Sequence, residues 1–122
     1  MTFVVLFSAP YMLPRRHHFQ PLLESYGIQV LSIEVKERLS EEQLLTVAGQ
    51  YDGTICGDDR YTARVLEACA PRLKVISKWG SGVDSIDHDA AARLGIQVCR
   101  TPNAFTLPVA DTVLGYMLAF AR

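Results

Sequence analysis

This sequence has no long hydrophobic run, no excess of basic residues and few cysteines, and each lack excludes a class of protein. The apolar run nearest the start, Phe3–Phe7, is far below the ~18 residues that cross a bilayer, so we expect no membrane segment. No charged segment precedes that run, so we also expect no signal peptide. A formal net charge of −1 gives no electrostatic support for nucleic-acid binding.

The spacing of the cysteines and histidines predicts neither a disulfide scaffold nor a metal site. Cys56, Cys69 and Cys99 are odd in number and widely spaced, which predicts reduced thiols in a cytoplasmic protein and neither a disulfide scaffold nor a zinc site. His17 and His18 follow two arginines and have no third ligand at a matching spacing, so we predict a solvated helix start and no metal. A hydrophobic content of 49% over 122 residues is typical of one domain with a single core.

Short apolar segments alternate with helical segments along the chain. Strands are expected at Phe3–Ser8, Ile28–Val35, Asp52–Cys56, Lys74–Lys78 and Ile96–Cys99. Helices are expected at Arg15–Tyr26, Ser40–Gly49, Thr62–Ala70 and Asp87–Leu94, and from Thr106 onward.

Five strands alternating with helices predict an α/β fold: a flavodoxin-like, doubly wound parallel sheet of strand order 2-1-3-4-5, followed by a C-terminal crossover helix. In such sheets ligands bind beyond the carboxyl ends of the strands. The loops Ala9–Pro14, Gly57–Arg60 and Trp79–Asp84 should meet at that edge. The last of them contains Gly80-Ser81-Gly82, a turn whose outward amides suit a carboxylate.

The final helix is apolar nearly all round, and one sheet face cannot bury such a helix. Its large apolar side chains point in several directions: Leu107, Val109, Val113, Leu114, Tyr116, Met117, Leu118 and Phe120. We therefore expect residues 106–122 to form a homodimer contact, and we expect the chain to continue in a longer protein.

Three blocks of sequence, KWGSGVDSID, AARLGIQV and TPNAFTLPVAD, together resemble the D-isomer-specific 2-hydroxyacid dehydrogenases, and among them the phosphoglycerate-dehydrogenase-like branch. The resemblance is strong over Leu73–Arg122 and weaker before it. It implies that residues 1–104 are a substrate-binding domain and that residues 105–122 lead to a Rossmann domain for NAD. The fingerprint G-x-G-x-x-G of that domain is absent from these 122 residues.

The resemblance also implies roles for particular residues. The amides around Gly80, Ser81, Gly82 and Val83 would hold the carboxylate of a 2-hydroxyacid or 2-oxoacid. Ser81 and Thr106 would lie on the cofactor side. Lys78 would hold the distal end of the substrate, although a solvated lysine at a strand end explains it as well. Where phosphoglycerate enzymes carry an arginine this chain has Gly57, and Arg60 could substitute for it.

The family's catalytic Arg, Glu and His match no residue here, so the resemblance implies no catalytic residue in this chain and no activity or bound cofactor for it alone. Neither NAD over NADP nor the identity of the hydroxyacid is determined. Two alternatives from other classes remain. A receiver-type signalling domain needs an acidic pair after the first strand, where Phe7-Ser8-Ala9 has none. A self-standing flavodoxin-like domain could bind anions or regulate without catalysis.

Overall fold

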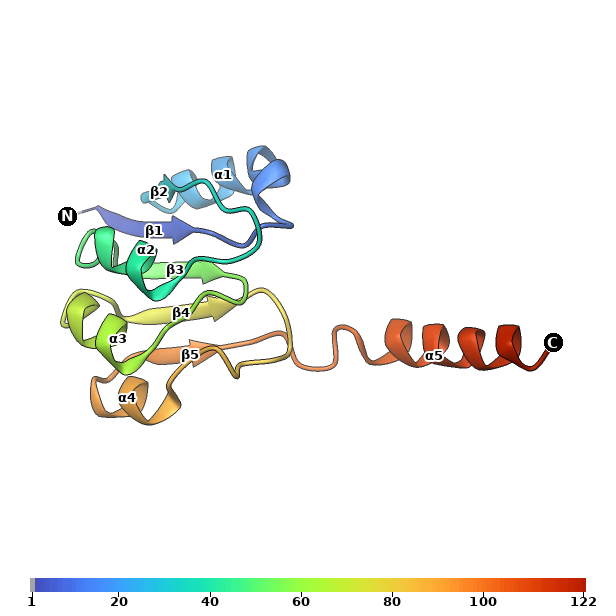
Figure 1. Ribbon diagram of the computed structural model, residues 1–122. Helices are drawn as coiled ribbons and strands as arrows, with labels where there is room; N and C mark the ends of the chain where they lie inside the picture. The colour runs from blue at the N-terminus through green and yellow to red at the C-terminus, as the bar shows by residue number, and fades with distance from the viewer. Residues whose placement is uncertain (1) are drawn as a thin grey trace.

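The computed structural model describes residues 2–122, and its centre is a five-stranded parallel sheet of order β2-β1-β3-β4-β5 (Figure 1). The strands are β1 (Phe3–Phe7), β2 (Ile28–Ser32), β3 (Gly53–Cys56), β4 (Val75–Lys78) and β5 (Gln97–Cys99). The predicted fold class and strand order are confirmed. All five strands point the same way, so their carboxyl ends share one edge.

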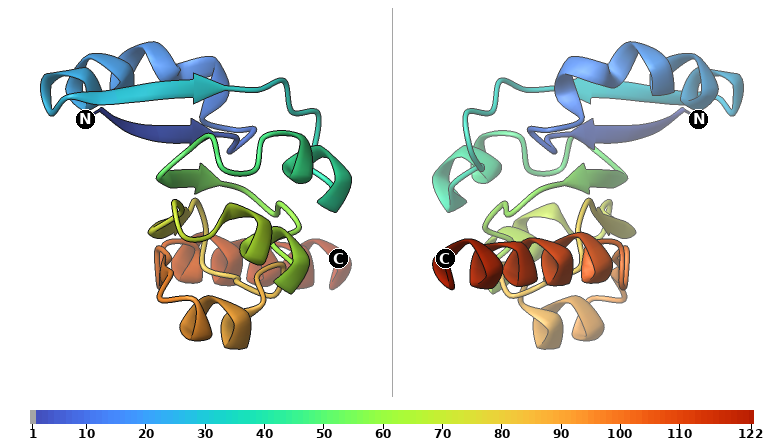
Figure 2. Two further views of the ribbon diagram at one scale, coloured as in Figure 1. Left: turned by 90° about the vertical axis from the view of Figure 1, so that its left-hand side faces the viewer. Right: turned by 90° about the vertical axis from the view of Figure 1, so that its right-hand side faces the viewer.

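Helices connect successive strands, and a last helix follows β5. They are α1 (Arg16–Ser25), preceded by the 3-10 turn η1 (Leu13–Arg15), then α2 (Glu41–Thr46), α3 (Ala63–Cys69), α4 (His88–Arg93) and α5 (Thr106–Phe120). The chain reverses its direction across the sheet after β2, and right-handed crossovers therefore place α1 on the face opposite α2, α3 and α4 (Figures 1 and 2).

Local caps set the starts of three helices, as predicted. Ser40 Oγ accepts from the Gln43 amide while the Gln43 side chain accepts from the Ser40 amide, which completes a capping box. Thr62 and Asp87 accept from the third residue of α3 and of α4 in the same way.

The second strand is shorter than its pattern predicts. The alternation of apolar residues continues to Val35, yet β2 ends at Ser32. β2 is an edge strand that pairs with β1, and β1 ends at Phe7, opposite Ser32. Beyond that point β1 offers no extended backbone to pair with, so the strand stops.

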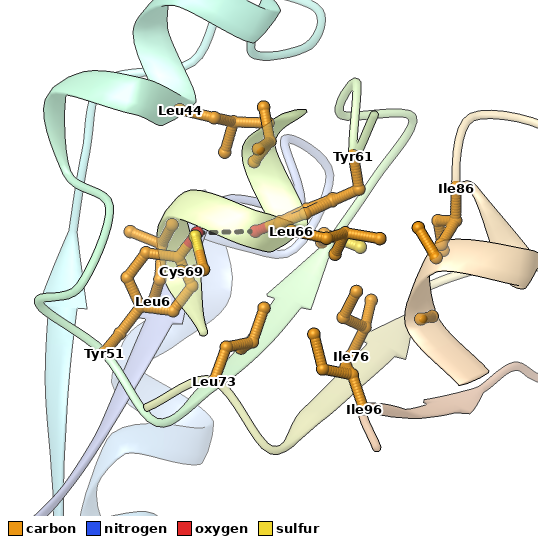
Figure 3. Packing of buried hydrophobic residues seen from close by; sticks show 14 of the residues in the cluster. Leu6, Leu44, Tyr51, Tyr61, Leu66, Cys69, Leu73, Ile76, Ile86 and Ile96 are labelled. Carbon is orange, nitrogen blue, oxygen red and sulfur yellow. Dashed lines mark hydrogen bonds between the residues drawn. The ribbon is translucent and has the colours of Figure 1, made fainter. Parts of the chain in front are cut away.

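The main core lies between the sheet and the helices α2, α3 and α4. Figure 3 shows Leu66, Leu73, Ile76 and Ile96 packed together there. At its centre the hydroxyl groups of Tyr51 and Tyr61 lie 3.3 Å apart, so each buried phenol has a polar partner.

The final helix differs from the others because it lies apart from the core, and none of its residues is buried. Figures 1 and 2 show α5 standing away from the sheet, on the side toward which the strands point. Its apolar side chains are open to solvent: Leu107, Val109, Val113, Leu114, Tyr116, Met117, Leu118 and Phe120 are all at least 47% exposed. The expectation that this sheet cannot bury the helix is confirmed.

Candidate functional site

A hollow of about 550 Å³ lies at the carboxyl edge of the sheet. The three loops that follow β1, β3 and β4 meet there, as the sequence predicts, and the β2–α2 loop and the residue before α5 join them. Its lining residues are Pro10, Tyr11, Glu37, Gly57, Asp58, Lys78, Trp79, Gly80, Ser81, Gly82 and Phe105.

The turn after β4 depends on glycine at position 80. Gly80 has φ +147°, a conformation that side chains disfavour, and a Cβ there would lie 3.3 Å from Lys78 Cε. Its carbonyl accepts from the Thr101 amide at 2.9 Å, which ties the turn to the segment after β5. Gly82 does not have a positive φ, and a Cβ there would meet nothing within 4 Å.

Three successive amides of this turn are available to a ligand. Among residues 2–122, the N–H groups of Ser81, Gly82 and Val83 donate no hydrogen bond to another part of the chain. The Val83 side chain packs against the core and does not line the hollow, so only its backbone could contribute. Such a run of free N–H groups at a turn is suited to an oxyanion.

Lys78 is not the solvated lysine that the sequence also allowed. It is only 5% exposed, and its ammonium group forms an ion pair with the carboxylate of Asp58, whose side chain is 74% exposed. The pair joins the ends of two neighbouring strands, since Cys56 of β3 lies opposite Lys78 of β4. The lysine that lines the hollow is therefore already matched by an anion.

Position 57, where the resemblance led us to look for an arginine, lies against the ring of Pro10, so a side chain there would force the two loops to shift. A Cβ on Gly57 would lie 2.8 Å from Cδ of Pro10. Arg60, the suggested substitute, is not brought to this hollow. It lines a different depression, formed with the β2–α2 loop and α2.

Aromatic rings from three distant parts of the chain form one wall. The ring centroids of Tyr11 and Trp79 lie 5.4 Å apart, and those of Trp79 and Phe105 lie 6.2 Å apart in an edge-to-face arrangement. These distances are typical of favourable aromatic contacts.

A second hollow, of about 520 Å³, adjoins the first and shares Ser81 and Phe105 with it. It brings together Ser81 and Thr106, the two residues assigned to the cofactor side, and Asn103 lines it with them. Arg100 also lines it, and its Nη1 donates to the Ser81 carbonyl at 3.0 Å.

A buried carboxylate holds three of the loops together behind the site. Asp59 is fully buried and accepts from the Leu39 amide at 2.7 Å and from the Ser8 hydroxyl at 2.5 Å. Loss of hydration on burial raises the pKa of Asp59, against the lowering effect of those two hydrogen bonds. Burial likewise raises the pKa of Cys56 to about 12, so this thiol is not a nucleophile at neutral pH.

Several residues of the site were not selected from the sequence. The sequence assigns no role to Asp58, Tyr11, Trp79, Phe105 or Arg100, although all of them line the two hollows. Asp58 could have been found, because neighbouring strands in the predicted order place residues 58 and 78 at one edge. The aromatic wall gives no such signal, because Tyr11, Trp79 and Phe105 lie in different loops and follow no helical or strand spacing in the sequence.

Within the part of the chain that the structure describes, no cluster of three or more His, Cys, Asp or Glu side chains could hold a metal ion. No helix in residues 2–122 is both long and apolar enough to span a bilayer.

A family model, the catalytic domain of D-isomer specific 2-hydroxyacid dehydrogenases, matches residues 4–116. The D-3-phosphoglycerate dehydrogenase of Synechocystis sp. is 36% identical over 95 residues, which cover 77% of this chain and 17% of that protein. The human D-3-phosphoglycerate dehydrogenase is 36% identical over 102 residues, which cover 83% of this chain and 18% of that protein. The chain thus spans less than a fifth of the length of these curated relatives.

Solved structures share the fold. The NAD+-bound 3-phosphoglycerate dehydrogenase of Entamoeba histolytica superposes with a TM-score of 0.79 at 25% identity, over 96% of this chain and 38% of that one. The TT0316 protein of Thermus thermophilus superposes with a TM-score of 0.75 at 31% identity, over 98% of this chain and 37% of that one.

Proposed function

Because this chain belongs to the D-isomer specific 2-hydroxyacid dehydrogenase family, we propose that it is the substrate-binding part of an oxidoreductase that transfers hydride between NAD and a small D-2-hydroxyacid. The observation that carries this proposal is the run of free amides at Ser81, Gly82 and Val83, beside a hollow at the carboxyl edge of the sheet. A 2-hydroxyacid and its 2-oxoacid product share a carboxylate, and these amides suit it.

The role of the chain in the reaction is positioning. Amides that hold the carboxylate fix the direction of the neighbouring C2 carbon, which is the carbon that gains or loses hydride. Holding reactants in one geometry removes much of the entropic part of a barrier. In this proposal the proton-transfer groups come from outside these 122 residues.

The second hollow is suited to the nicotinamide side of the cofactor. Ser81 and Thr106 provide hydroxyl groups and Asn103 an amide, a set that can hydrogen-bond a carboxamide, while Val109 and Ala110 provide apolar surface. NAD, when bound, supplies the hydride acceptor. The NAD+ bound to the Entamoeba histolytica enzyme supports NAD as the cofactor.

We further propose that residues 1–104 form the substrate-binding domain and that α5 is a contact helix, used between domains and between two copies of the protein. The support is the exposure of its large apolar side chains, which leaves a binding surface over the length of the helix. The three free cysteines support a reducing, cytoplasmic location.

A ligand titration tests the proposed function. D-lactate, the smallest chiral 2-hydroxyacid, added to the isotopically labelled chain should shift the amide resonances of Ser81, Gly82 and Val83. Acetate, which has the carboxylate without the hydroxyl group, should bind more weakly. If D-lactate moves none of these three amides at millimolar concentration, the turn is only structural and the proposal is wrong.

A further inference from the structure

Resting on the function proposed above, we propose that the substrate of this site carries an uncharged aromatic group at the end remote from its carboxylate, and not a phosphate. The inference concerns the hollow that the glycine turn shares with Tyr11, Trp79 and Phe105.

The first support is the aromatic wall. Trp79 immediately precedes the turn and lines the same hollow, so it is within reach of a ligand whose carboxylate lies at the amides of residues 81–83. Tyr11 and Phe105 line the same hollow, and their ring centroids lie 5.4 Å and 6.2 Å from that of Trp79. A planar ring can stack on or against each of these groups, whereas a phosphate gains nothing from them.

The second support is the charge of the hollow. Its charged lining residues are Glu37, Asp58 and Lys78, which sum to one negative charge. The Lys78 ammonium is buried and is already paired with Asp58. A phosphate would have to displace the Asp58 carboxylate from Lys78 and then lie close to two carboxylates, and like charges at short range are unfavourable.

The third support is the placement of the arginines around this hollow. A side chain at position 57 would clash with Pro10, and Arg60 lies in a different depression. Arg100 lines the adjoining hollow, where its guanidinium group is bonded to the Ser81 carbonyl. Of the described residues that line the aromatic hollow none is an arginine, although arginine is the side chain best matched to phosphate.

The hollow is also large enough for such a ligand. Its volume of about 550 Å³ lies within the ~300–1,000 Å³ usual for small-molecule sites. A three-carbon acid that bears one aromatic ring therefore fits in size as well as in chemistry.

A comparison of three hydroxyacids tests the proposal: D-3-phenyllactate, D-3-phosphoglycerate and D-lactate. Trp79 is the only tryptophan of the chain, so its fluorescence and its indole N–H resonance report on this hollow alone. We expect D-3-phenyllactate to bind with a dissociation constant at least tenfold below that of D-3-phosphoglycerate and to shift the Trp79 indole resonance. D-lactate should shift the amides of residues 81–83 with a smaller effect on the indole.

Two variants separate the aromatic argument from the charge argument. Tyr11→Ala, at a side chain 75% exposed, should weaken binding of D-3-phenyllactate about fivefold. Tyr26→Ala is the matched control, since Tyr26 is 77% exposed and does not line the hollow, and it should change nothing. Asp58→Asn should strengthen binding of D-3-phosphoglycerate severalfold, because it frees the charge of Lys78. Circular dichroism of each variant verifies that it is folded.

The outcomes are distinguishable. If D-lactate shifts the amides of residues 81–83 but D-3-phosphoglycerate binds as tightly as D-3-phenyllactate, the proposed function stands and the aromatic substrate class is wrong. The same conclusion follows if Tyr11→Ala has no more effect than Tyr26→Ala. If none of the three acids shifts those amides, the proposed function fails and the substrate class fails with it.

Discussion

The ring of Pro10 occupies the space next to Gly57, so that a Cβ on Gly57 would lie only 2.8 Å from Pro10 Cδ. Two loops that follow different strands, β1 and β3, therefore touch at a point where only glycine fits. Both residues line the hollow, and their contact limits the side chains that can be present at position 57.

Gly57→Ala should destabilise the protein. The added methyl group forces the two loops apart, and overpacking of this kind costs about 1–3 kcal/mol of unfolding free energy. Urea denaturation measures it. Gly82→Ala is the control, because a Cβ there meets nothing within 4 Å and the backbone is not left-handed, so its effect should stay within about 0.5 kcal/mol. Equal stability of the two variants would contradict the tight contact at Pro10.

Gly82→Val should impair ligand binding and leave folding intact. Its branched side chain would project beside the free amides of Ser81 and Val83 and obstruct a carboxylate, while nothing in the protein stands within 4 Å of its Cβ. We expect D-lactate affinity to fall at least tenfold, with a change in the urea midpoint no larger than for Gly82→Ala. Wild-type affinity in this variant would mean that the carboxylate binds elsewhere.

Asp59 should make stability depend on pH. Burial raises its pKa in the folded state above the ordinary 3.8, so the folded protein binds the proton more tightly than the unfolded chain does. The favourable contribution is complete below 3.8 and is lost as the pH rises through the folded-state pKa. Asp59→Asn can keep hydrogen bonds to Leu39 and Ser8 without a titrating group.

The unfolding free energy, measured in urea at a series of pH values upward from 3.8, should therefore decline more steeply for the wild type than for Asp59→Asn. Asp59→Ala should be destabilised across the whole series, because the Leu39 amide and the Ser8 hydroxyl lose their partner. Parallel pH profiles for the wild type and Asp59→Asn would show that Asp59 does not titrate in this range.

The 122-residue chain should form a dimer or a larger assembly through α5. Burial of apolar surface contributes about 25 cal/mol per Å², so three or four large apolar side chains left in water lose on the order of 5 kcal/mol of stabilisation. Packing the helix against a second copy of the chain recovers part of this free energy. Light scattering at micromolar concentration should give at least twice the 13.6 kDa mass of the chain. A chain ending at Ala104 is the control and should be monomeric. A monomer with an ordered α5 would contradict this prediction.

The 122 residues by themselves should produce no NADH from any D-2-hydroxyacid. They contain no G-x-G-x-x-G phosphate-binding loop, and in the proposed function the proton-transfer groups lie outside them. NADH absorbance measures the reaction. The intact enzyme of a relative, assayed with its own substrate, is the positive control. Formation of NADH by the pure chain above the level of a blank would place acid–base groups within it.

The starts of the helices could be predicted because their signals are local, and the order of the strands because right-handed crossovers leave few topologies for alternating strands and helices. Ser40, Thr62 and Asp87 each cap the helix that follows, whatever the rest of the chain does. The end of β2 could not be predicted this way. It depends on where β1 stops, which is a property of the partner strand and not of the apolar alternation up to Val35.

The glycine turn was found from its sequence, but the surroundings of Lys78 were not. The sequence places Lys78 at a strand end, where lysines are commonly solvated. In the structure the loop after the neighbouring strand brings Asp58 beside it, and Lys78 is buried. The sequence also placed Arg60 too close to the hollow. It lies only three residues after Gly57, but the chain turns toward Leu39, whose carbonyl accepts from the Arg60 amide at 3.1 Å, and carries Arg60 away from the hollow.

The residue at the base of α5 belongs to the wall of the hollow. Phe105 immediately precedes the helix, and its ring meets Trp79 edge to face. The helix therefore begins beside a ring that lines the hollow. A partner that binds the exposed length of α5 and turns it would also move that ring, so in the proposed function assembly and ligand affinity are coupled.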